Sequence, residues 1–180
     1  EDPTIPPVGF VIDYLTYGGL YREVWLEATA ESRLTDLFVY TPTLQEAVVQ
    51  WTAELTPAAA AVRIRLETAD GTLLAEQTAP AAETGKMQLS VPDARPWDTE
   101  PPVLHHAIAE LLNAAGQPID RKQVTFGFRT AEFRADGFYL NGKKTFLRGL
   151  NRHQSYPYIG YAAPESLQRE DASILQEELH

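Results

Sequence analysis

Hydrophobic and polar residues alternate along much of this chain, and the alternation predicts β-strands. In "LQEAVVQWTAEL", every second residue from Ala47 to Leu55 is apolar. Side chains of a strand point alternately to its two faces, so such a run predicts a strand with one buried face. The same pattern recurs in "AVRIRLETA", "KMQLSV" and "VTFGF", and we interpret "LTDLFVY" and "LLAEQTA" as strands too.

The segment "VLHHAIAELL" is more continuously apolar, so its pattern suits a helix as well as a strand. We interpret it as a strand because a turn, "NAAGQP", and another alternating run follow it. The chain then has about seven short strands between roughly residues 33 and 128. This number and spacing predict a mainly β fold, an immunoglobulin-like β-sandwich.

Two dipeptides, Asp70-Gly71 and Asn141-Gly142, tolerate the positive φ angles of tight hairpin turns. The second lies within "DGFYLNGKKTFLRG", which we interpret as a further hairpin after the sandwich. Nearer the N-terminus, "YGGLYREVWLEATA" predicts another strand, because Val24, Leu26 and Ala28 alternate with larger or charged neighbours.

A short apolar run from Phe146 to Leu150 ends in three polar residues, Asn151, Arg152 and His153. The run predicts a buried strand, and side chains just past the end of a parallel barrel strand face the active site. Polar loops after strands are also common, so a structural loop with Arg152 in an ion pair is the alternative. Three tyrosines that could stack on a sugar follow at once: Tyr156, Tyr158 and Tyr161.

The segment "APESLQREDASILQEEL" predicts an amphipathic helix. Pro164 suits the first turn of a helix, and Glu165 suits the positive end of its dipole. The apolar residues form one stripe: Leu167, Ile174, Leu175 and Leu179. A helix with such a stripe needs a partner, so we expect the chain to be a piece of a longer protein.

Composition narrows the classes of function. The 180 residues are 44% hydrophobic, enough for a core, and the formal net charge is −10. This charge argues against a nucleic-acid partner or an anionic membrane surface, because both attract basic residues. The sequence has no cysteine and no apolar run that approaches the roughly 18 residues of a membrane span. The compartment stays open, with the cytoplasm favoured.

Common catalytic and metal motifs are missing from the sequence, including G-x-S-x-G, the P-loop and H-E-x-x-H. His105 and His106 are neighbours on a predicted strand, so they point to opposite faces and cannot bind one ion together. We therefore expect a structural role for both and assign no metal ligand in this chain. The acidic residues of the predicted strands are expected on solvated positions.

Three stretches together resemble family 2 glycoside hydrolases, and most of all their β-galactosidases. They are "DYLTYGGLYREVWLE" (13–27), "RPWDTEPPVLHHAIAELLNAAGQPID" (95–120) and "FGFRTAEFRADGFYLNGKKTFLRGLNRHQSYPYIGYA" (126–162). The β-galactosidases commonly carry Glu after the Asn-Arg-His triplet, whereas this chain has Gln154. The β-glucuronidase branch tends to have Lys at the position of Arg152, so Arg152 favours a galactosidase.

The resemblance implies a division of the chain into parts of three domains. Residues 1–28 would be the end of an N-terminal sugar-binding jelly roll, and residues 29–130 the immunoglobulin-like sandwich. Residues 131–180 would be a hairpin followed by the first strand and first helix of an incomplete (β/α)8 barrel. The apolar strand before His153 would then line the barrel and deliver the polar cluster to its mouth.

The resemblance also implies a retaining mechanism, with a pair of glutamates about 5–5.5 Å apart as acid/base and nucleophile. In the family these lie on later barrel strands, so we expect no catalytic residue in this chain and no activity of the chain alone. What carries over is substrate binding by His153 and, more weakly, by Asn151 and Arg152. No cofactor is implied here; magnesium and sodium would be held by other parts of the parent, which would form a homo-oligomer.

The expected activity of the parent is therefore hydrolysis of terminal β-galactosides. Two alternatives remain open from the residues alone. The first is a different substrate, a β-glucuronide or a β-mannoside. The second is a non-catalytic accessory sandwich that binds carbohydrate or another domain.

Overall fold

The computed structural model describes residues 19–178 of the chain. Within this range the chain divides into two compact units. One extends over Ala28–Arg148, and the other combines residues 19–27 with residues 149–178. Each unit has its own internal contacts and is described separately below. The described residues contain no helix that is both long and apolar enough to cross a bilayer.

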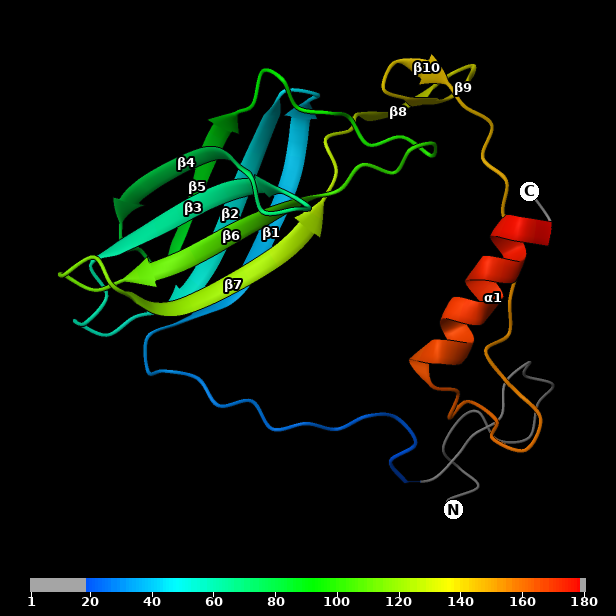
Figure 1. Ribbon diagram of the computed structural model, residues 1–180, viewed down its shortest axis with the longest axis horizontal. Helices are drawn as coiled ribbons and strands as arrows, with labels where there is room; N and C mark the ends of the chain where they lie inside the picture. Colours follow the sequence, from blue (N-terminus) through cyan, green and yellow to red (C-terminus); the bar gives the residue numbers. More distant parts are fainter. Residues whose placement is uncertain (1–18, 179–180) are drawn as a thin grey trace. The chain divides into compact units, whose positions relative to one another are not determined.

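The unit Ala28–Arg148 is built on two antiparallel sheets (Figure 1). The first has the order β1-β2-β5, and the second has the order β4-β3-β6-β7. Their bounds are β1 Arg33–Thr43, β2 Glu46–Glu54, β3 Ala61–Thr68, β4 Leu73–Pro80, β5 Thr84–Ser90, β6 His105–Leu112 and β7 Pro118–Phe126. The β-sandwich prediction is confirmed, as is the interpretation of "VLHHAIAELL" as a strand.

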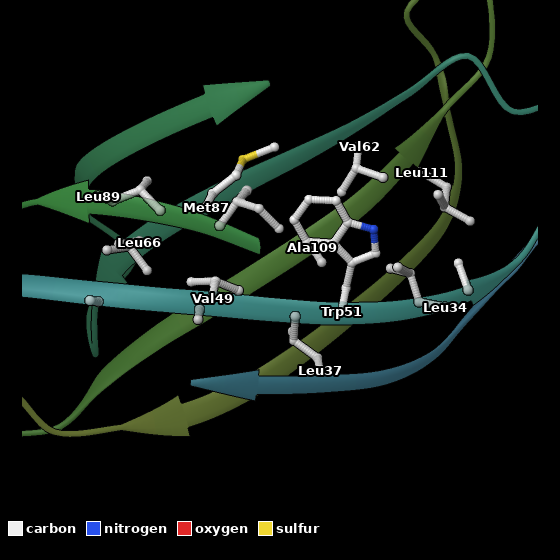
Figure 2. Packing of buried hydrophobic residues seen from close by; sticks show 14 of the residues in the cluster. Leu34, Leu37, Val49, Trp51, Val62, Leu66, Met87, Leu89, Ala109 and Leu111 are labelled. Atoms are coloured by element: carbon white, nitrogen blue, oxygen red, sulfur yellow. The ribbon is translucent and has the colours of Figure 1, made fainter. Parts of the chain in front are cut away.

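The core lies between the inner faces of these two sheets, where the apolar alternation places it. Ala47, Val49, Trp51 and Ala53 of β2 are all buried. They belong to one cluster with apolar residues of the facing sheet, such as Val62 (Figure 2). Burial of one aliphatic side chain contributes about 1.5–3 kcal/mol, so this cluster is the main source of the unit's stability.

The fourth strand decides the topology of the sandwich. In constant-type immunoglobulin domains this strand joins the first sheet, whereas here β4 pairs with β3. The connection after Thr68 is short, and Gly71 has a φ of 87° that lets the chain reverse at once. The Thr68 amide also donates to the Thr72 carbonyl across the turn, at 2.9 Å. The chain therefore returns beside β3 and extends the second sheet.

A third, small sheet follows the sandwich, with the order β10-β9-β8. Its strands are β8 Ala131–Arg134, β9 Gly137–Leu140 and β10 Lys143–Lys144. The turn between the last two confirms the predicted hairpin, because Asn141 and Gly142 both have positive φ, 52° and 77°. The Asn141 side chain accepts from the Thr130 amide at 3.0 Å and donates to the Trp97 carbonyl at 2.8 Å. These two bonds fasten the hairpin to the sandwich.

Two predicted strands are absent from the structure. Neither the segment around Val24 and Leu26 nor the run from Phe146 to Leu150 is a strand, and all four side chains are exposed. Both segments have strand-like patterns, but a strand forms only by hydrogen bonding to a neighbour. Within residues 19–178 no strand pairs with either of them. The start of a barrel over residues 131–180 stays a prediction.

The expectation of a solvated acidic face is wrong at two positions. Glu67 and Glu110 are 7% and 6% exposed. The Glu110 carboxylate accepts from Arg63 Nε at 2.8 Å, and Glu67 forms an ion pair with Arg65. Long arginine side chains on the same sheet cover these carboxylates, and the opposite charge makes the burial tolerable.

Candidate functional site

The predicted polar cluster lies in the loop before helix α1, Glu165–Glu178. The helix begins where the sequence predicts it, and the Pro164 carbonyl accepts from the Leu167 amide at 3.1 Å. Glu165 and Arg169 form an i,i+4 ion pair on its first turns. Ile174 and Leu175 of the apolar stripe are 42% and 37% exposed, while Leu179 lies outside the described residues.

Arg152 is the residue of the triplet whose side chain contacts helix α1. Its guanidinium forms an ion pair with Asp171 and donates to Gln168 Oε1 at 2.7 Å, and both partners are on α1. Its Nη2 atom also donates to the Tyr156 hydroxyl at 2.9 Å. All three contacts lie within one unit of the chain. The structure therefore places Arg152 in an ion pair, and substrate binding by this residue stays a prediction.

Tyr156 completes this arrangement by donating its hydroxyl proton to Asp171 Oδ2, at 2.5 Å. The hydrogen bond from Tyr156 and the positive charge of Arg152 lower the pKa of Asp171. The same bond to the Asp171 carboxylate raises the pKa of Tyr156, because loss of the phenolic proton would leave two anions in contact. Asp171 likewise raises the pKa of Arg152. The cluster is stable as carboxylate, phenol and guanidinium.

The Tyr156 backbone is held by a tight turn that follows the triplet. Its amide donates to the Gly160 carbonyl at 3.1 Å, and the Gly160 amide donates back at 2.9 Å. Gly160 has a φ of 56°, and Tyr158 inside the turn has a φ of 70°. Of the tyrosines expected to stack on a sugar, Tyr158 has a fully exposed side chain. Tyr156 instead bonds to α1 through its hydroxyl group.

Asn151 and His153 flank Arg152 and are exposed. We find no hydrogen bond or ion pair from either side chain to any residue in the range 19–178. The next residue, Gln154, accepts from Arg22 Nη2 at 3.4 Å. The structure thus brings Arg152 to α1 while its two neighbours are exposed, and substrate binding by Asn151 and His153 stays a prediction.

Sequence reasoning missed the partners of Arg152. Asp171 and Gln168 lie in the predicted amphipathic helix, outside its apolar stripe. Their separation of three residues places them on one helix face, next to each other. That spacing was visible in the sequence, but nothing local indicated that Arg152, nineteen residues before Asp171, would reach this face.

A hollow of about 890 Å³ lies in the same unit. It is lined by the exposed segment from Leu20 to Trp25 and by residues from Ala162 to Gln168. None of the triplet residues lines it. The described residues hold no group of three or more His, Asp or Glu that could bind a metal ion.

The two adjacent histidines have separate structural surroundings. His105 is 2% exposed and lies edge-on to Phe128, with ring centroids 5.0 Å apart. His106 points to the other face, where Nδ1 lies 3.3 Å from Thr125 Oγ1. The two rings therefore lie on opposite faces of β6, as the strand alternation predicts.

Comparison with known proteins identifies the family. Residues 32–129, more than half of the chain, match glycosyl hydrolases family 2. A β-galactosidase of Thermoanaerobacter pseudethanolicus is 35% identical over 99% of this chain and 25% of its own length. A β-galactosidase of Thermoanaerobacterium thermosulfurigenes is 37% identical over 100% of this chain and 27% of its own length. The chain belongs to glycosyl hydrolases family 2 and resembles its β-galactosidases, and it spans about a quarter of these relatives.

Solved structures of β-glucuronidases share the fold. The apo structure of Bacteroides uniformis β-glucuronidase 3 matches with a TM-score of 0.78 and 26% identity, over 92% of this chain and 21% of that chain. A putative β-glucuronidase of Formosa agariphila is 32% identical over 92% of this chain and 21% of its own length. Two branches with different named substrates therefore share this fold, so the fold by itself does not select the sugar.

Proposed function

We propose that this chain is a segment of a retaining glycoside hydrolase that cleaves terminal β-galactosides. The observation that carries the proposal is the match to β-galactosidases along the whole chain, at 35% and 37% identity. In this proposal the sandwich is scaffold and the loop before α1 reaches the substrate pocket. The acid/base and nucleophile glutamates belong to other parts of the parent protein.

Within that loop, His153 and Asn151 contact the sugar, and Arg152 holds them in place. This division of roles is supported by the contacts of Arg152, whose guanidinium bonds to Asp171, Gln168 and Tyr156. Its exposed neighbours make no such contacts within the part of the chain that the structure describes. An imidazole and an amide can each donate to or accept from a sugar hydroxyl. A loop fixed by Arg152 presents them without further ordering on binding.

A β-glucuronide is the second candidate substrate, and one observation favours it. The putative β-glucuronidase of Formosa agariphila is 32% identical across 92% of this chain. A glucuronide carries a carboxylate, and the guanidinium of Arg152 is already neutralised by Asp171. The neutral galactoside therefore fits the loop better. A β-mannoside or a purely accessory sandwich has no such observation in its support.

The test uses the full-length protein that contains this chain and three nitrophenyl substrates: β-galactoside, β-glucuronide and β-mannoside. We expect the galactoside to have the highest kcat/KM. In that protein, His153→Phe should lower kcat and kcat/KM together, because a contact made mainly in the transition state affects both. Loss of one such hydrogen bond in a dry pocket costs about 2–4 kcal/mol, or about 10²–10³ in rate.

The matched control is His106→Phe, the same substitution on an outer face of the sandwich. It should leave kcat/KM within about twofold, a free-energy change well under 1 kcal/mol. A His153→Phe enzyme within about threefold of wild type would refute the role of His153. Preference for the glucuronide would replace the proposed substrate. If the full-length protein turned over none of the three substrates, the proposed hydrolase activity would be excluded and the accessory role favoured.

A further inference from the structure

The outer face of the sheet β1-β2-β5 carries two neighbouring aromatic rings. Phe38 and Tyr40 lie two residues apart on β1, so both point to this face. They are 54% and 41% exposed, and their ring centroids are 6.2 Å apart. Val48, the partner of Tyr40 in the sheet register, is also on this face, yet it is only 6% exposed. The rings thus cover an apolar strip on a face where polar residues are expected.

The outer face of the other sheet is different. There Arg63 is paired with Glu110, and Arg65 with Glu67 and Glu76. Each charged side chain of this ladder therefore has a partner of opposite charge within the sheet.

Three polar side chains beside the two aromatic rings, in contrast, have no partner among the described residues. Asp36, Gln50 and Lys86 stand around Phe38, and Gln50 pairs in register with both Phe38 and Lys86. Across the described residues, none of these three side chains makes a hydrogen bond or ion pair. They offer a carboxylate acceptor, an amide that both donates and accepts, and an ammonium donor.

These residues enclose a shallow groove of about 370 Å³. Its outward-pointing lining residues are Asp36, Phe38, Gln50, Thr52, Thr84 and Lys86. The volume suits one or two sugar rings, at the lower end of the range for ligand pockets in proteins. The lining contains one carboxylate and one ammonium, so a ligand that fits it needs no net charge.

The apolar part of the face is smaller than a whole protein interface. One aromatic side chain buries at most about 150–250 Å². Two such rings fall below the roughly 800 Å² that each partner buries in a standard protein interface. A small ligand with one apolar face and several hydroxyl groups matches the groove better.

We propose that this groove is a carbohydrate-binding site for a neutral mono- or disaccharide, separate from the loop that contains His153. The C–H face of a pyranose stacks on Phe38, whose ring face carries partial negative charge. Hydroxyl groups of the sugar donate to Asp36, accept from Lys86 and do both with Gln50. The proposal concerns binding without turnover, so it stands or fails independently of the proposed hydrolase activity.

The test is an NMR titration of the 15N-labelled 180-residue chain. The probes are lactose, β-1,4-galactobiose and β-1,4-mannobiose, each up to about 10 mM, a range that detects Kd values near 1 mM. We expect at least one probe to shift the amides of residues 36–40, 50–52 and 84–86. Phe38→Ala should weaken binding at least about tenfold, equivalent to ~1.4 kcal/mol. Lys86→Met should also weaken it, and it tests the site if Phe38→Ala does not fold.

Phe133→Ala is the matched control, because Phe133 is a still more exposed phenylalanine on β8. It should leave the affinity unchanged. Three results would each overturn the proposal: no shift with any probe, equal shifts in Phe38→Ala and wild type, or shifts elsewhere on the protein. Concentration-dependent self-association that Phe38→Ala abolishes would assign the face to a protein contact and also overturn it.

Discussion

Replacement of Gly85 by alanine should destabilise the sandwich. Gly85 lies on β5 directly opposite Trp51 of β2. A methyl group at this position would lie 2.1 Å from Trp51 Cζ2, 2.5 Å from Cη2 and 2.7 Å from Cε2. Trp51 is 4% exposed and packed in the core (Figure 2), so its ring has little room to move.

The magnitude follows from two effects on Trp51. Overpacking of a filled core costs about 1–3 kcal/mol. A displaced indole would also lose the hydrogen bond that Nε1 donates to the Ala82 carbonyl at 3.1 Å, at a net cost of about 1 kcal/mol. Replacement of a glycine also restricts the unfolded chain, which raises the free energy of unfolding by about 0.4–1 kcal/mol. We expect Gly85→Ala to lower the free energy of unfolding by about 2 kcal/mol.

Urea denaturation followed by circular dichroism measures this change, and a double-mutant cycle tests its cause. Trp51→Phe has a smaller ring that lacks the atoms nearest Gly85. In that background Gly85→Ala should cost much less, which gives a coupling energy of about 2 kcal/mol between the two positions. Gly149→Ala is the control, because a methyl group there would meet nothing within 4 Å.

Two results would contradict the reasoning. A loss of less than about 1 kcal/mol for Gly85→Ala would mean that the core adjusts around the methyl group. An equal loss in the presence and absence of Trp51 would mean that the indole ring is not what the methyl group meets.

Three further predictions concern other parts of the chain. The pure chain should not hydrolyse a nitrophenyl β-galactoside above a buffer blank, and measurable turnover would place catalytic groups within it. Asn141→Ala should weaken protection of the β9 and β10 amides against hydrogen exchange by about 2–3 kcal/mol, because two hydrogen bonds are lost and alanine tolerates the positive φ poorly. Asn141→Gly should recover about 1 kcal/mol of this loss. Unchanged protection in Asn141→Ala would exclude the role of this side chain in fastening the hairpin. Burial, with Arg95 and His106 nearby, lowers the pKa of His105, so the unfolded chain takes up the proton first. The free energy of unfolding should therefore fall as the pH drops below the ordinary histidine pKa of about 6.5. His105→Phe should reduce this fall when urea denaturation is compared at about pH 7.5 and about pH 5. The same pH dependence in the variant and in wild type would contradict this prediction.

The sequence by itself determined the local features of this protein. The two-residue period of β2 and β3 set which side chains form the core, because the pleat of a strand fixes that period. Asn141-Gly142 set the turn of the hairpin, because few residues adopt positive φ easily. Pro164 marked the start of α1 in the same way, through its fixed φ.

Only the tertiary structure decided the features that depend on a distant partner. The same strand pattern became a strand at β2 but not around Leu26, because pairing depends on a neighbouring strand. Glu110 is buried rather than solvated because Arg63, 47 residues away, lies beside it. Arg152 is bound to Asp171 of α1, nineteen residues away, and the sequence pattern did not indicate that contact. Sequence periodicity contains no information about such contacts, because the energy of a pair depends on which two segments the fold brings together.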